Sequence, residues 1–507
     1  MQAQRLSAAS LDSDLMTTGF DGRSVDPFPG IVLMAESTFV PKAFRRAIDA
    51  EQAVVCKARS SAFSFRCPDR LASTQRAFDF LTDCLRLLLS TLCTVARRKS
   101  LLSARAAHGP VTSRLHVDSV LPMSPRAILP ERESATGRSN ARKILVVDAD
   151  YPRPDRDSGS LRMFNMLLLM RDMGCRVQFL ATKATGHDAY AASLQRHGIE
   201  LAVAPTRFRM LRWWYLQGSK FDVVILSRLP VALGAIRHVR RYASQASVVF
   251  DTVDLHFLRI SRQAALHADS EKAAWADQLR EYELGLMQSV DLTVVVSSYE
   301  QKLLHAIQPT VPVKVLSNIH APHGRQLPFC ARSALLYVGN FEHEPNLDAA
   351  RWLVNELMPV LRGQLQGIRL HIVGHASDEV LGHLASVDVI VHGYVADLAP
   401  MLGSVKLAVV PLRYGAGVKG KINLAMSYGV PVVTTAIGAE GMNLQNRRDA
   451  MIAEGAEKFA SAIVEAYTNE PLWLRLSDAG VENVKRHFSP EVAADVLKDI
   501  LGAQPKS

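Results

Sequence analysis

The stretch "KLAVVPLRYGAGVKGKINLAMSYGVPVV", residues 406–433, joins two apolar runs through a glycine-rich loop and a helical segment. After Lys406, residues 407–412 form an apolar run that is typical of a buried strand. Residues 418–429 are expected to form a helix, because Gly429 can end it and Pro431 follows. A strand, loop, helix and strand in this order predict a parallel sheet with helices packed on its faces.

The same alternation runs through most of the chain. It begins at Lys143 with "KILVVDA" and continues through "CRVQFLAT", "IELAVAP", "FDVVILS", "ASVVFDTVD", "DLTVVVSS" and "VPVKVLSN". After a polar joint, a second series opens with "ALLYVGNF" and includes "GIRLHIVG", "VDVIVHGY", "VPVVTT" and "AMIAE". We therefore predict an α/β protein with two tandem Rossmann-like, doubly wound domains, at residues 142–325 and 326–507. Ligands of such sheets bind beyond the carboxyl ends of the strands, so both domains should face a common cleft.

Residues 1–141 differ in character from the rest of the chain. Short apolar runs there are interrupted by Ser, Arg and Pro, and only about residues 74–98 have helical spacing of apolar residues. We predict a largely disordered N-terminal extension with one helix. The basic end of that helix also fits a membrane-surface role.

Composition limits the functional classes. A net charge of +10 favours anionic partners, among them nucleic acid, phosphorylated metabolites and anionic membrane faces. The six cysteines show neither C-x-x-C spacing nor a Cys/His cluster, which argues against a zinc site or a disulfide framework. The start of the chain lacks the layout of a signal peptide, and the most apolar stretch is broken by Asp83 and Arg86. These features predict a cytoplasmic protein without a transmembrane helix.

The loop after residue 412 has the features of a phosphate site. Gly415 and Gly417 allow backbone N–H groups to approach a ligand, and the following helix presents unpaired N–H donors. Arg413, Lys419 and Lys421 add three positive charges, although cations at a helix N-terminus oppose the helix dipole. An anionic ligand explains this arrangement better than a solvated first turn. We predict that the loop binds a phosphate or diphosphate.

Several segments together resemble a known family. The stretch "PLRYGAGVKGKINLAMSYGVPVVTTAIGAEGM" is similar to the donor-binding region of GT-B, family-4-type glycosyltransferases (glycosyl transferases group 1) of bacterial polysaccharide synthesis. The segments "YPRPDRDSGSLRMFNMLLLMRDMG", "DTVDLHFLR", "VVVSSYEQKLL", "LYVGNFEHEPNLDAARWL" and "VHGYVADLAPML" resemble the same family, in the same order. The resemblance covers about residues 143–501.

This resemblance implies a GT-B fold and an enzyme that transfers a sugar from a nucleotide-diphosphate donor to a glycan or lipid-linked acceptor. It further implies retention of anomeric configuration, and it implies no metal and no cofactor besides the donor. Many relatives carry a Glu at the position of Leu424 and an acidic residue at that of Ala416; both acids are absent here. Glu440 is a candidate to contact the donor instead, or it is a solvated loop acid.

Two loops of the first domain supply candidate acceptor-side groups. Asp251, Asp254 and His256 lie close together in the sequence at the end of a predicted strand, and the resemblance places an acceptor-side His or Asp there. Either Asp254 or His256 is a candidate to orient or deprotonate the acceptor, although a histidine in such a place is often only structural. Gly159 and Ser160 start a helix that is expected to approach the donor phosphates or the acceptor, unless their loop forms only a rigid lid.

The loop "VGNFEHEPN" of the second domain leaves its first strand toward the same cleft. Gly339 and Asn340 suit close backbone approach and hydrogen bonding, and His343 is a candidate contact for the diphosphate or the sugar. Asn346 is predicted to be a helix N-cap. In "VSSYE", Ser297 and Glu300 also have their simplest interpretation as capping residues.

Other functional classes remain open at this point. A sugar-nucleotide epimerase would share the two domains and the anion loop, and a non-catalytic sugar-nucleotide-binding or scaffold subunit would explain the missing acids. A dinucleotide-dependent oxidoreductase is disfavoured because the first domain has no strand–G-x-G-x-x-G–helix motif. We expect nucleotide-sugar and acceptor partners, peripheral contact with the inner membrane face, and no nucleic acid.

Overall fold

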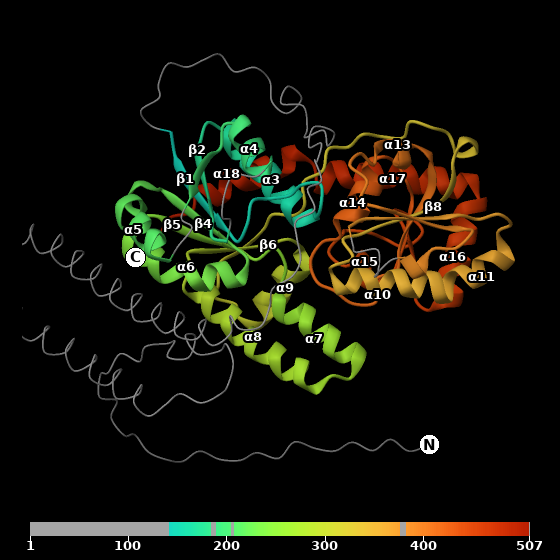
Figure 1. Cartoon of the computed structure of the whole chain (residues 1–507), viewed down its shortest axis with the longest axis horizontal. Coiled ribbons are helices and arrows are strands. Elements are labelled where there is room, and N and C mark those ends of the chain that lie inside the picture. The colour runs from blue at the N-terminus through green and yellow to red at the C-terminus, as the bar shows by residue number, and fades with distance from the viewer. Residues whose placement is uncertain (1–140, 184–188, 204–206, 376–381, 506–507) are drawn as a thin grey trace, which may run out of the picture. The chain divides into compact units, whose positions relative to one another are not determined.

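The computed structural model describes residues 141–183, 189–203, 207–375 and 382–505. The expectations for residues 1–140, including the helix at residues 74–98, lie outside the described residues. Within the described part, two parallel sheets follow each other along the chain (Figure 1). We refer to the sheet of β1–β7 with its helices as the first half, and to the sheet of β8–β13 with its helices as the second half.

The first sheet has seven parallel strands in the order β3-β2-β1-β4-β5-β6-β7. Its strands are β1 Lys143–Asp148, β2 Arg176–Ala181, β3 Glu200–Val203, β4 Val223–Ser227, β5 Ser247–Asp251, β6 Leu292–Val295 and β7 Val313–Val315. Each coincides with an apolar run predicted from the sequence. The Val, Ile and Leu side chains of these runs are buried on both faces of the sheet, which explains why helices cover both faces.

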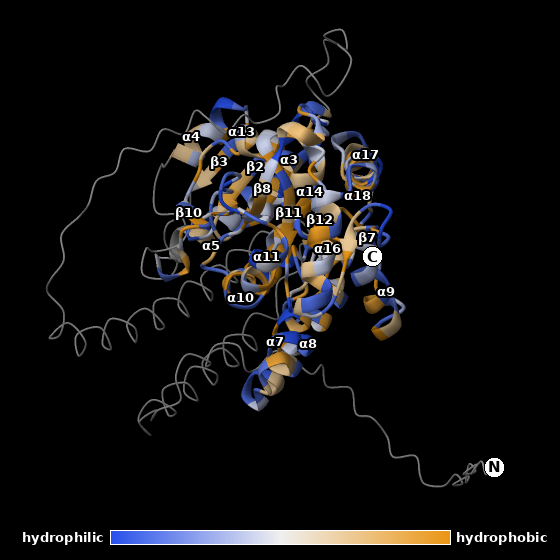
Figure 2. Ribbon diagram, turned by 90° about the vertical axis from the view of Figure 1, so that its right-hand side faces the viewer, coloured by the Kyte–Doolittle hydropathy of each residue, from blue (hydrophilic) through white to orange (hydrophobic). Residues whose placement is uncertain are grey.

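The helices of the first half connect these strands and cover the sheet (Figure 1). They are α3 Ser158–Asp172, α4 Ala189–Arg196, α5 Arg207–Gln217, α6 Leu229–Tyr242, α7 His256–His267, α8 Ser270–Gln288 and α9 Ser298–Ile307, with a short 3₁₀ turn η1 Gly218–Lys220. The pair α7 and α8 forms a helical hairpin that extends away from its sheet (Figures 1 and 2).

The second sheet repeats the arrangement with six parallel strands in the order β10-β9-β8-β11-β12-β13. Its strands are β8 Ser333–Val338, β9 Leu370–Val373, β10 Val389–Gly393, β11 Val405–Val410, β12 Val432–Thr434 and β13 Met451–Ile452. Its helical segments are η2 Phe329–Ala331, α10 Glu344–Trp352, η3 Leu353–Leu357, α11 Met358–Gln364, η4 Gly382–Leu384, α13 Ala399–Ser404, α14 Gly420–Ser427, α15 Ala436–Ala439, α16 Ala456–Thr468 and α17 Glu470–His487. The expected helix at residues 418–429 is thus α14, which begins two residues later and ends before Gly429.

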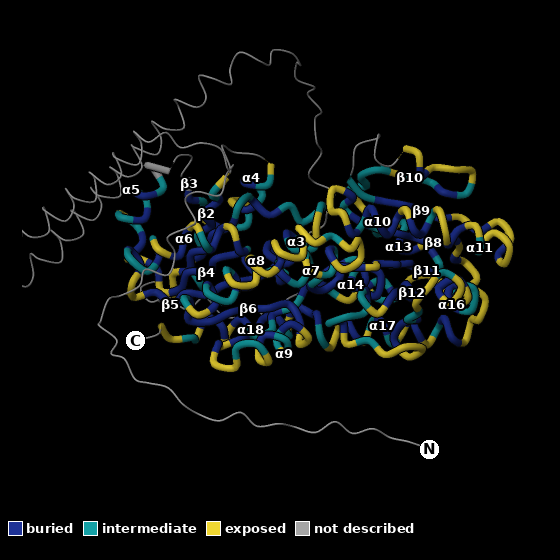
Figure 3. Tube along the Cα trace, turned by 90° about the horizontal axis from the view of Figure 1, so that it is seen from below, coloured by how far each residue is buried: buried dark blue, intermediate teal, exposed yellow. Residues whose placement is uncertain are grey.

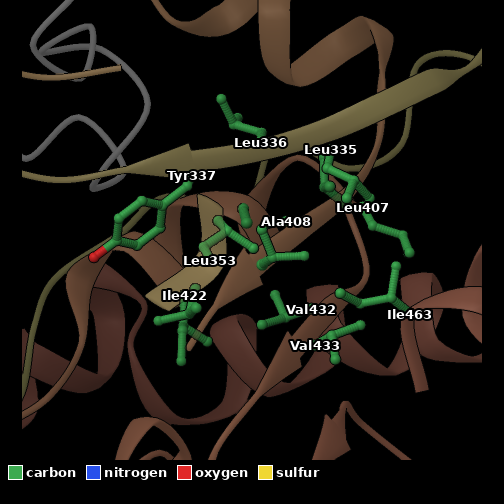
Figure 4. Packing of buried hydrophobic residues seen from close by; sticks show 14 of the residues in the cluster. Leu335, Leu336, Tyr337, Leu353, Leu407, Ala408, Ile422, Val432, Val433 and Ile463 are labelled. Carbon is green, nitrogen blue, oxygen red and sulfur yellow. The ribbon is translucent and has the colours of Figure 1, made fainter. Parts of the chain in front are cut away.

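Burial follows the layers of each half. The central strands are buried, whereas the edge strand β10 is only partly buried. The outer faces of helices such as α11 and α16 are exposed (Figure 3), and apolar residues gather on the strands (Figure 2). In the second half, Leu335, Leu407 and Val433 of the sheet pack with Leu353 and Ile463 of the covering helices (Figure 4). This core fixes the ends of β8 and β11, from which the candidate site is built.

The last helix, α18 Pro490–Leu501, does not stay with the second sheet. Ala493, Leu497 and Ile500 are buried in the same cluster as Phe164 and Leu167 of α3, in the first half. Figure 1 shows α18 beside α3. The prediction that residues 326–507 form one domain therefore needs correction for this helix. An amphipathic helix has the same spacing of apolar residues whether it packs on the first sheet or on the second, so the sequence does not say which sheet α18 covers.

In the described ranges, none of the helices has the length and apolar content needed to span a membrane.

Candidate active site

The candidate site lies where the connectivity of each sheet changes direction. In the first sheet this point is between β1 and β4, and in the second it is between β8 and β11. Loops leaving two such strands diverge and create the crevice in which ligands of doubly wound sheets bind. The predicted residues Gly339, Asn340 and His343 follow β8, and residues 413–421 follow β11. The topology therefore brings both predicted donor loops to one point.

Lys421 occupies the second position of α14 and points toward the loop after β8. Its Nζ lies 2.6 Å from Asn346 Oδ1, 3.4 Å from Tyr337 Oη and 4.6 Å from the centre of the Tyr337 ring. A Cβ atom on Gly339 would lie only 3.3 Å from this ammonium, so a glycine keeps the approach open. Burial, together with the nearby charge of Lys419, lowers the pKa of Lys421 to about 7. Among the described residues, the hydrogen-bond partners of this cation are the neutral side chains of Asn346 and Tyr337, which suits it to an incoming anion.

Lys419 has a different role in the loop. Its side chain is buried and its Nζ donates to the carbonyl of Gly417 at 2.6 Å. Burial lowers the pKa of Lys419 to about 8, against the opposing effect of Glu440 and Glu300. Lys419 thus holds the loop in place through its bond to Gly417, while Lys421 faces the site.

The side chains of Arg413 and Glu440 are already engaged in ion pairs. Arg413 forms a two-pronged ion pair with Asp348 of α10, with Nε 2.9 Å from Oδ2. Glu440 receives both guanidinium nitrogens of Arg262 from α7, each at 2.7 Å. Gly415 contributes its carbonyl to the same guanidinium, at 2.7 Å. In this conformation neither charge is free for a ligand.

The loop after β8 corrects one sequence prediction. Helix α10 begins at Glu344 with His343 in the N-cap position, so Asn346 is not the N-cap. Pro345 accounts for the earlier start, because proline fits the first turn of a helix. Asn346 instead joins the two loops: its Nδ2 donates to Asn340 O at 2.7 Å while its Oδ1 accepts from Lys421. Asn340 Oδ1 accepts from the backbone of Glu342, which makes a turn.

In the first half, Asp254 and His256 lie close together. Asp254 Oδ1 is 3.7 Å from His256 Nε2, and Asp254 Oδ2 accepts from Arg259 Nε at 2.8 Å. Burial raises the pKa of Asp254, but Arg259 and His256 outweigh it and hold that pKa below its ordinary value. Burial also lowers the pKa of His256, despite the attraction of Asp254. Near neutral pH the pair is a carboxylate beside a neutral imidazole.

The backbone before this pair is in a rare conformation. Val253 has φ of +64°, and a β-branched residue in this region is a genuine outlier. Such strain persists only where surrounding contacts enforce it, and it is concentrated at functional sites. The conformation carries the chain from β5 to the Asp254 side chain within three residues.

Two buried acids that the sequence analysis did not assign to the site accept backbone N–H groups of the segments that form it. Glu283 of α8 is fully buried and accepts the first two N–H groups of α7, from His256 at 3.0 Å and from Phe257 at 2.9 Å. Burial raises the pKa of Glu283 to about 8. Glu300 accepts from Val296 N, and burial raises its pKa to about 7. Ser297 caps α9 by accepting from Glu300 N at 3.2 Å, which confirms the capping interpretation.

The first sheet carries a second charged group at its own switch point. Asp148, at the end of β1, accepts from Arg228 Nε at 3.1 Å, and burial raises the pKa of Asp148 to about 6. Arg228 itself has φ of +71°. Behind them, Arg162 and Asp251 form an ion pair at 2.9 Å, with both side chains 1% exposed. In the sequence, Asp148, Arg228 and Asp251 are visible only as charged residues at or just after the end of a strand. This position does not show which residue pairs with which.

The predicted helix start at Gly159 and Ser160 is confirmed, with α3 beginning at Ser158. Asp157 is the N-cap, and it accepts both the N–H and the hydroxyl of Ser160 at 2.8 Å. A Cβ atom on Gly159 would lie 3.1 Å from Val253, and one on Gly420 would lie 2.3 Å from Ser158 Cβ. Close packing at these glycines brings α3, the strained loop and α14 together.

Contacts between the two halves bring their candidate residues to one place. Both Asp254 and Lys421 influence the pKa of His343, which burial lowers. A Cβ atom on Gly417 would lie 3.3 Å from Asp254 Cβ. Farther out, Tyr394 donates to Asp155 Oδ2 at 2.6 Å. Asp254 and His256 thus face the loop that carries Lys419 and Lys421.

Within the described part of the chain, no group of three or more His, Cys, Asp or Glu side chains is placed to hold a metal ion.

Comparison with known proteins gives a family match for part of the chain. Residues 332–469 match the model of the family described as "Glycosyl transferases group 1". A protein of Klebsiella pneumoniae, described as an uncharacterised 44.6 kDa protein in the cps region, is 28% identical over 144 residues, which are 27% of this chain and 37% of that protein. The match thus spans well under two thirds of that relative.

Solved structures show the same fold. Sucrose-phosphate synthase of Thermosynechococcus elongatus has a TM-score of 0.55 at 14% identity, covering 71% of this chain and 98% of that one. TarM of S. aureus, solved with fondaparinux, alpha-GlcNAc-glycerol and UDP, has a TM-score of 0.58 at 10% identity, over 71% of this chain and all of that one. HepE of Anabaena, solved with UDP and glucose, has a TM-score of 0.55 at 14% identity, covering 71% of this chain and 99% of that one. The fold is GT-B, as predicted, and the resemblance predicted from the motifs is confirmed by the family model over residues 332–469.

Proposed function

We propose that the protein is a glycosyltransferase that moves a sugar from a nucleotide-diphosphate donor to a glycan or lipid-linked acceptor in surface polysaccharide synthesis. One observation carries the proposal. Lys421, a cation whose partners in the described part of the chain are neutral, lies at the switch point of the second sheet. Asp254 and His256 lie opposite it in the first half. The matching family and the UDP complexes of TarM and HepE support this interpretation.

The proposed chemistry divides between the two halves. Lys421 and the free N–H groups at the start of α14 would bind the diphosphate and stabilise the negative charge that grows on it as the glycosidic bond breaks. Neutral His256 would accept the proton of the acceptor hydroxyl, and Asp254 would orient that imidazole or the hydroxyl. The diphosphate leaves with the bonding electron pair, and the acceptor oxygen forms the new bond to the sugar.

Further features of the proposal follow from the family resemblance. We propose transfer with retention of configuration and without a metal ion, because lysine and backbone donors supply positive charge at the leaving group. Arg413 and Glu440 would join the donor site only if their ion pairs opened. A cytoplasmic location with peripheral contact at the inner membrane face also belongs to the proposal.

A non-catalytic sugar-nucleotide-binding subunit is the second candidate. Leu424 and Ala416 favour it, since they stand where many relatives carry acids, and Leu424 packs against the core of the second half. A sugar-nucleotide epimerase would use the same cleft without an acceptor.

The experiment that separates these candidates is an assay of nucleotide release from a panel of sugar nucleotides. The purified protein is tested with and without lipid-linked acceptor, and in parallel with EDTA. Acceptor-dependent release that survives EDTA supports a metal-independent transferase. Binding without release supports the non-catalytic subunit, acceptor-independent conversion of the donor sugar supports the epimerase, and loss of release in EDTA would refute the metal-free mechanism.

A further inference from the structure

A separate cavity of about 260 Å³ lies between the two halves, which we call the hinge crevice. None of the residues proposed above to bind donor or acceptor lines it. Its walls come from the start of α9, the segment after β7, the loop after α15 and one side of α18, and they include Ser298, Ser317, Asn443, Ser489, Val492 and Val496.

Both chain crossings between the halves contribute to the hinge crevice. The segment with Ser317 and Asn318 follows β7 and leads from the first sheet toward the second. His487 and Ser489 lie where α17 ends and the chain returns to the first half as α18. A ligand in this crevice would therefore contact both crossings at once.

The polar wall of the crevice is rich in hydrogen-bond donors. Helix α9 presents its N-terminus there, and the N–H groups of Ser298 and Tyr299 have no acceptor in the described part of the chain. The N-terminus of a helix carries a partial positive charge and binds anions. No Asp or Glu lines the crevice, so nothing acidic competes for these donors.

Two serine hydroxyls in the wall make no hydrogen bond with the described residues, which is an observation independent of the helix. Ser489 is 3% exposed, and its hydroxyl makes no capping hydrogen bond although it holds the N-cap position of α18. Ser317 Oγ is buried and has no hydrogen-bond partner among the described residues. Buried polar groups are normally hydrogen-bonded, so two such hydroxyls beside a helix N-terminus indicate a missing acceptor.

We propose that the hinge crevice binds a phosphate monoester. Its phosphate would accept from the start of α9 and from the hydroxyls of Ser317 and Ser489, and its carbon part would lie against Val492 and Val496. The volume favours an ester over free phosphate, since it falls just below the about 300–1,000 Å³ of typical small-molecule sites. Without a lysine or arginine in the wall, the crevice suits one phosphate better than a diphosphate.

The test is calorimetric titration of the full chain with glucose 6-phosphate, inorganic phosphate and glucose as probes. We expect the ester to bind more tightly than phosphate, and glucose not to bind. Ser489→Asp is the decisive variant, because Asp caps a helix as well as Ser does but places a negative charge in the crevice. We expect it to weaken binding of the ester at least tenfold with an unchanged thermal transition.

The matched control is Lys421→Ala, which alters the candidate donor site and leaves the crevice intact. Affinity for the ester should be unchanged in this variant, whereas affinity for UDP should fall in Lys421→Ala and persist in Ser489→Asp. The proposal is overturned if wild type binds no ester, if Ser489→Asp binds it normally, if only Lys421→Ala loses it, or if glucose binds equally well. Failure of UDP to bind at all would count against the proposed function and not against the crevice.

Discussion

Arg262 of α7 and Glu440 after α15 form a two-pronged ion pair across the halves, with both nitrogen–oxygen distances at 2.7 Å. The same guanidinium donates to the carbonyl of Gly415. The two side chains are 18% and 16% exposed, so water screens the pair only in part. One arginine of the first half thus holds two segments of the second half that border the candidate donor site.

Removal of this arginine should destabilise the protein and loosen the donor loop. We expect Arg262→Ala to lower the free energy of unfolding by about 1.5–3 kcal/mol, the range for a hydrogen bond to a charged group, and to weaken UDP binding. Chemical denaturation and calorimetry measure the two effects. Arg176→Ala is the control: its pair with Glu200 is exposed, so about 0–1 kcal/mol is expected. Equal losses in both variants would contradict a special role for Arg262.

Lys421 is predicted to contribute most to binding of the diphosphate. Loss of a charged hydrogen bond of about 1.5–3 kcal/mol corresponds to about ten- to a hundredfold weaker binding of UDP by Lys421→Ala. The thermal transition should change little, because loss of the contacts with Asn346 and Tyr337 is offset by removal of a cation whose burial is unfavourable. Titration with UDP, GDP and the monophosphates measures this. Lys458→Ala, an exposed lysine of α16, is the control; equal affinity in the two variants would remove Lys421 from the site.

Binding of the diphosphate should depend on pH through the same side chain. Burial lowers the pKa of Lys421 to about 7, so part of the population is neutral near pH 7.5. A bound phosphate favours the charged form, so binding takes up a proton and weakens as pH rises from 6.5 to 8.5. Calorimetry in buffers of different ionisation enthalpy measures the uptake. Lys421→Arg stays charged and should give a flatter profile. A profile as steep as that of wild type would assign the effect to another group.

The sequence was sufficient for the strands and for the loops that carry the site, because long apolar runs and glycine-rich turns are local signals. The sequence does not show which residue forms an ion pair or hydrogen bond with each charged side chain, because these partners come from distant parts of the chain. Lys421 and Arg413 look alike in sequence, yet Arg413 pairs with Asp348 from another helix, while Lys421 contacts the neutral side chains of Asn346 and Tyr337. Asn346 was mistaken for an N-cap because Pro345 shifts the helix start. The location of α18 was missed because an amphipathic helix fits either sheet.

The acceptor-side pair should affect turnover far more than donor binding. We expect Asp254→Asn or His256→Ala to lower kcat by about 10²–10⁴-fold, as for a general acid or base, with UDP affinity within about twofold of wild type. Steady-state kinetics and titration together provide the comparison. His305→Ala, an exposed histidine of α9, serves as control. Near-native turnover in both variants would move the acceptor chemistry to other residues.

Glu283 should make the fold less stable as pH rises. Its pKa is raised to about 8 by burial, against about 4.3 for an unfolded glutamate. The folded state therefore holds a proton that the unfolded state has lost, and its stabilising effect, complete below about pH 4, is lost as pH rises through 8. Glu300 and Asp148, with pKa values near 7 and 6, act in the same direction. We expect the denaturation midpoint of wild type to decrease as pH rises from 6 to 9.

Glu283→Gln tests the assignment of this pH effect. Glutamine does not ionise, so the variant should lose less stability than wild type between pH 6 and pH 9. It should be less stable than wild type at pH 6, because the amide offers one acceptor oxygen to the two N–H groups of His256 and Phe257. Glu457→Gln, an exposed position on α16, should follow the wild-type slope. A Glu283→Gln slope identical to that of wild type would show that Glu283 keeps its charge in the fold, and the two backbone hydrogen bonds would then outweigh its burial.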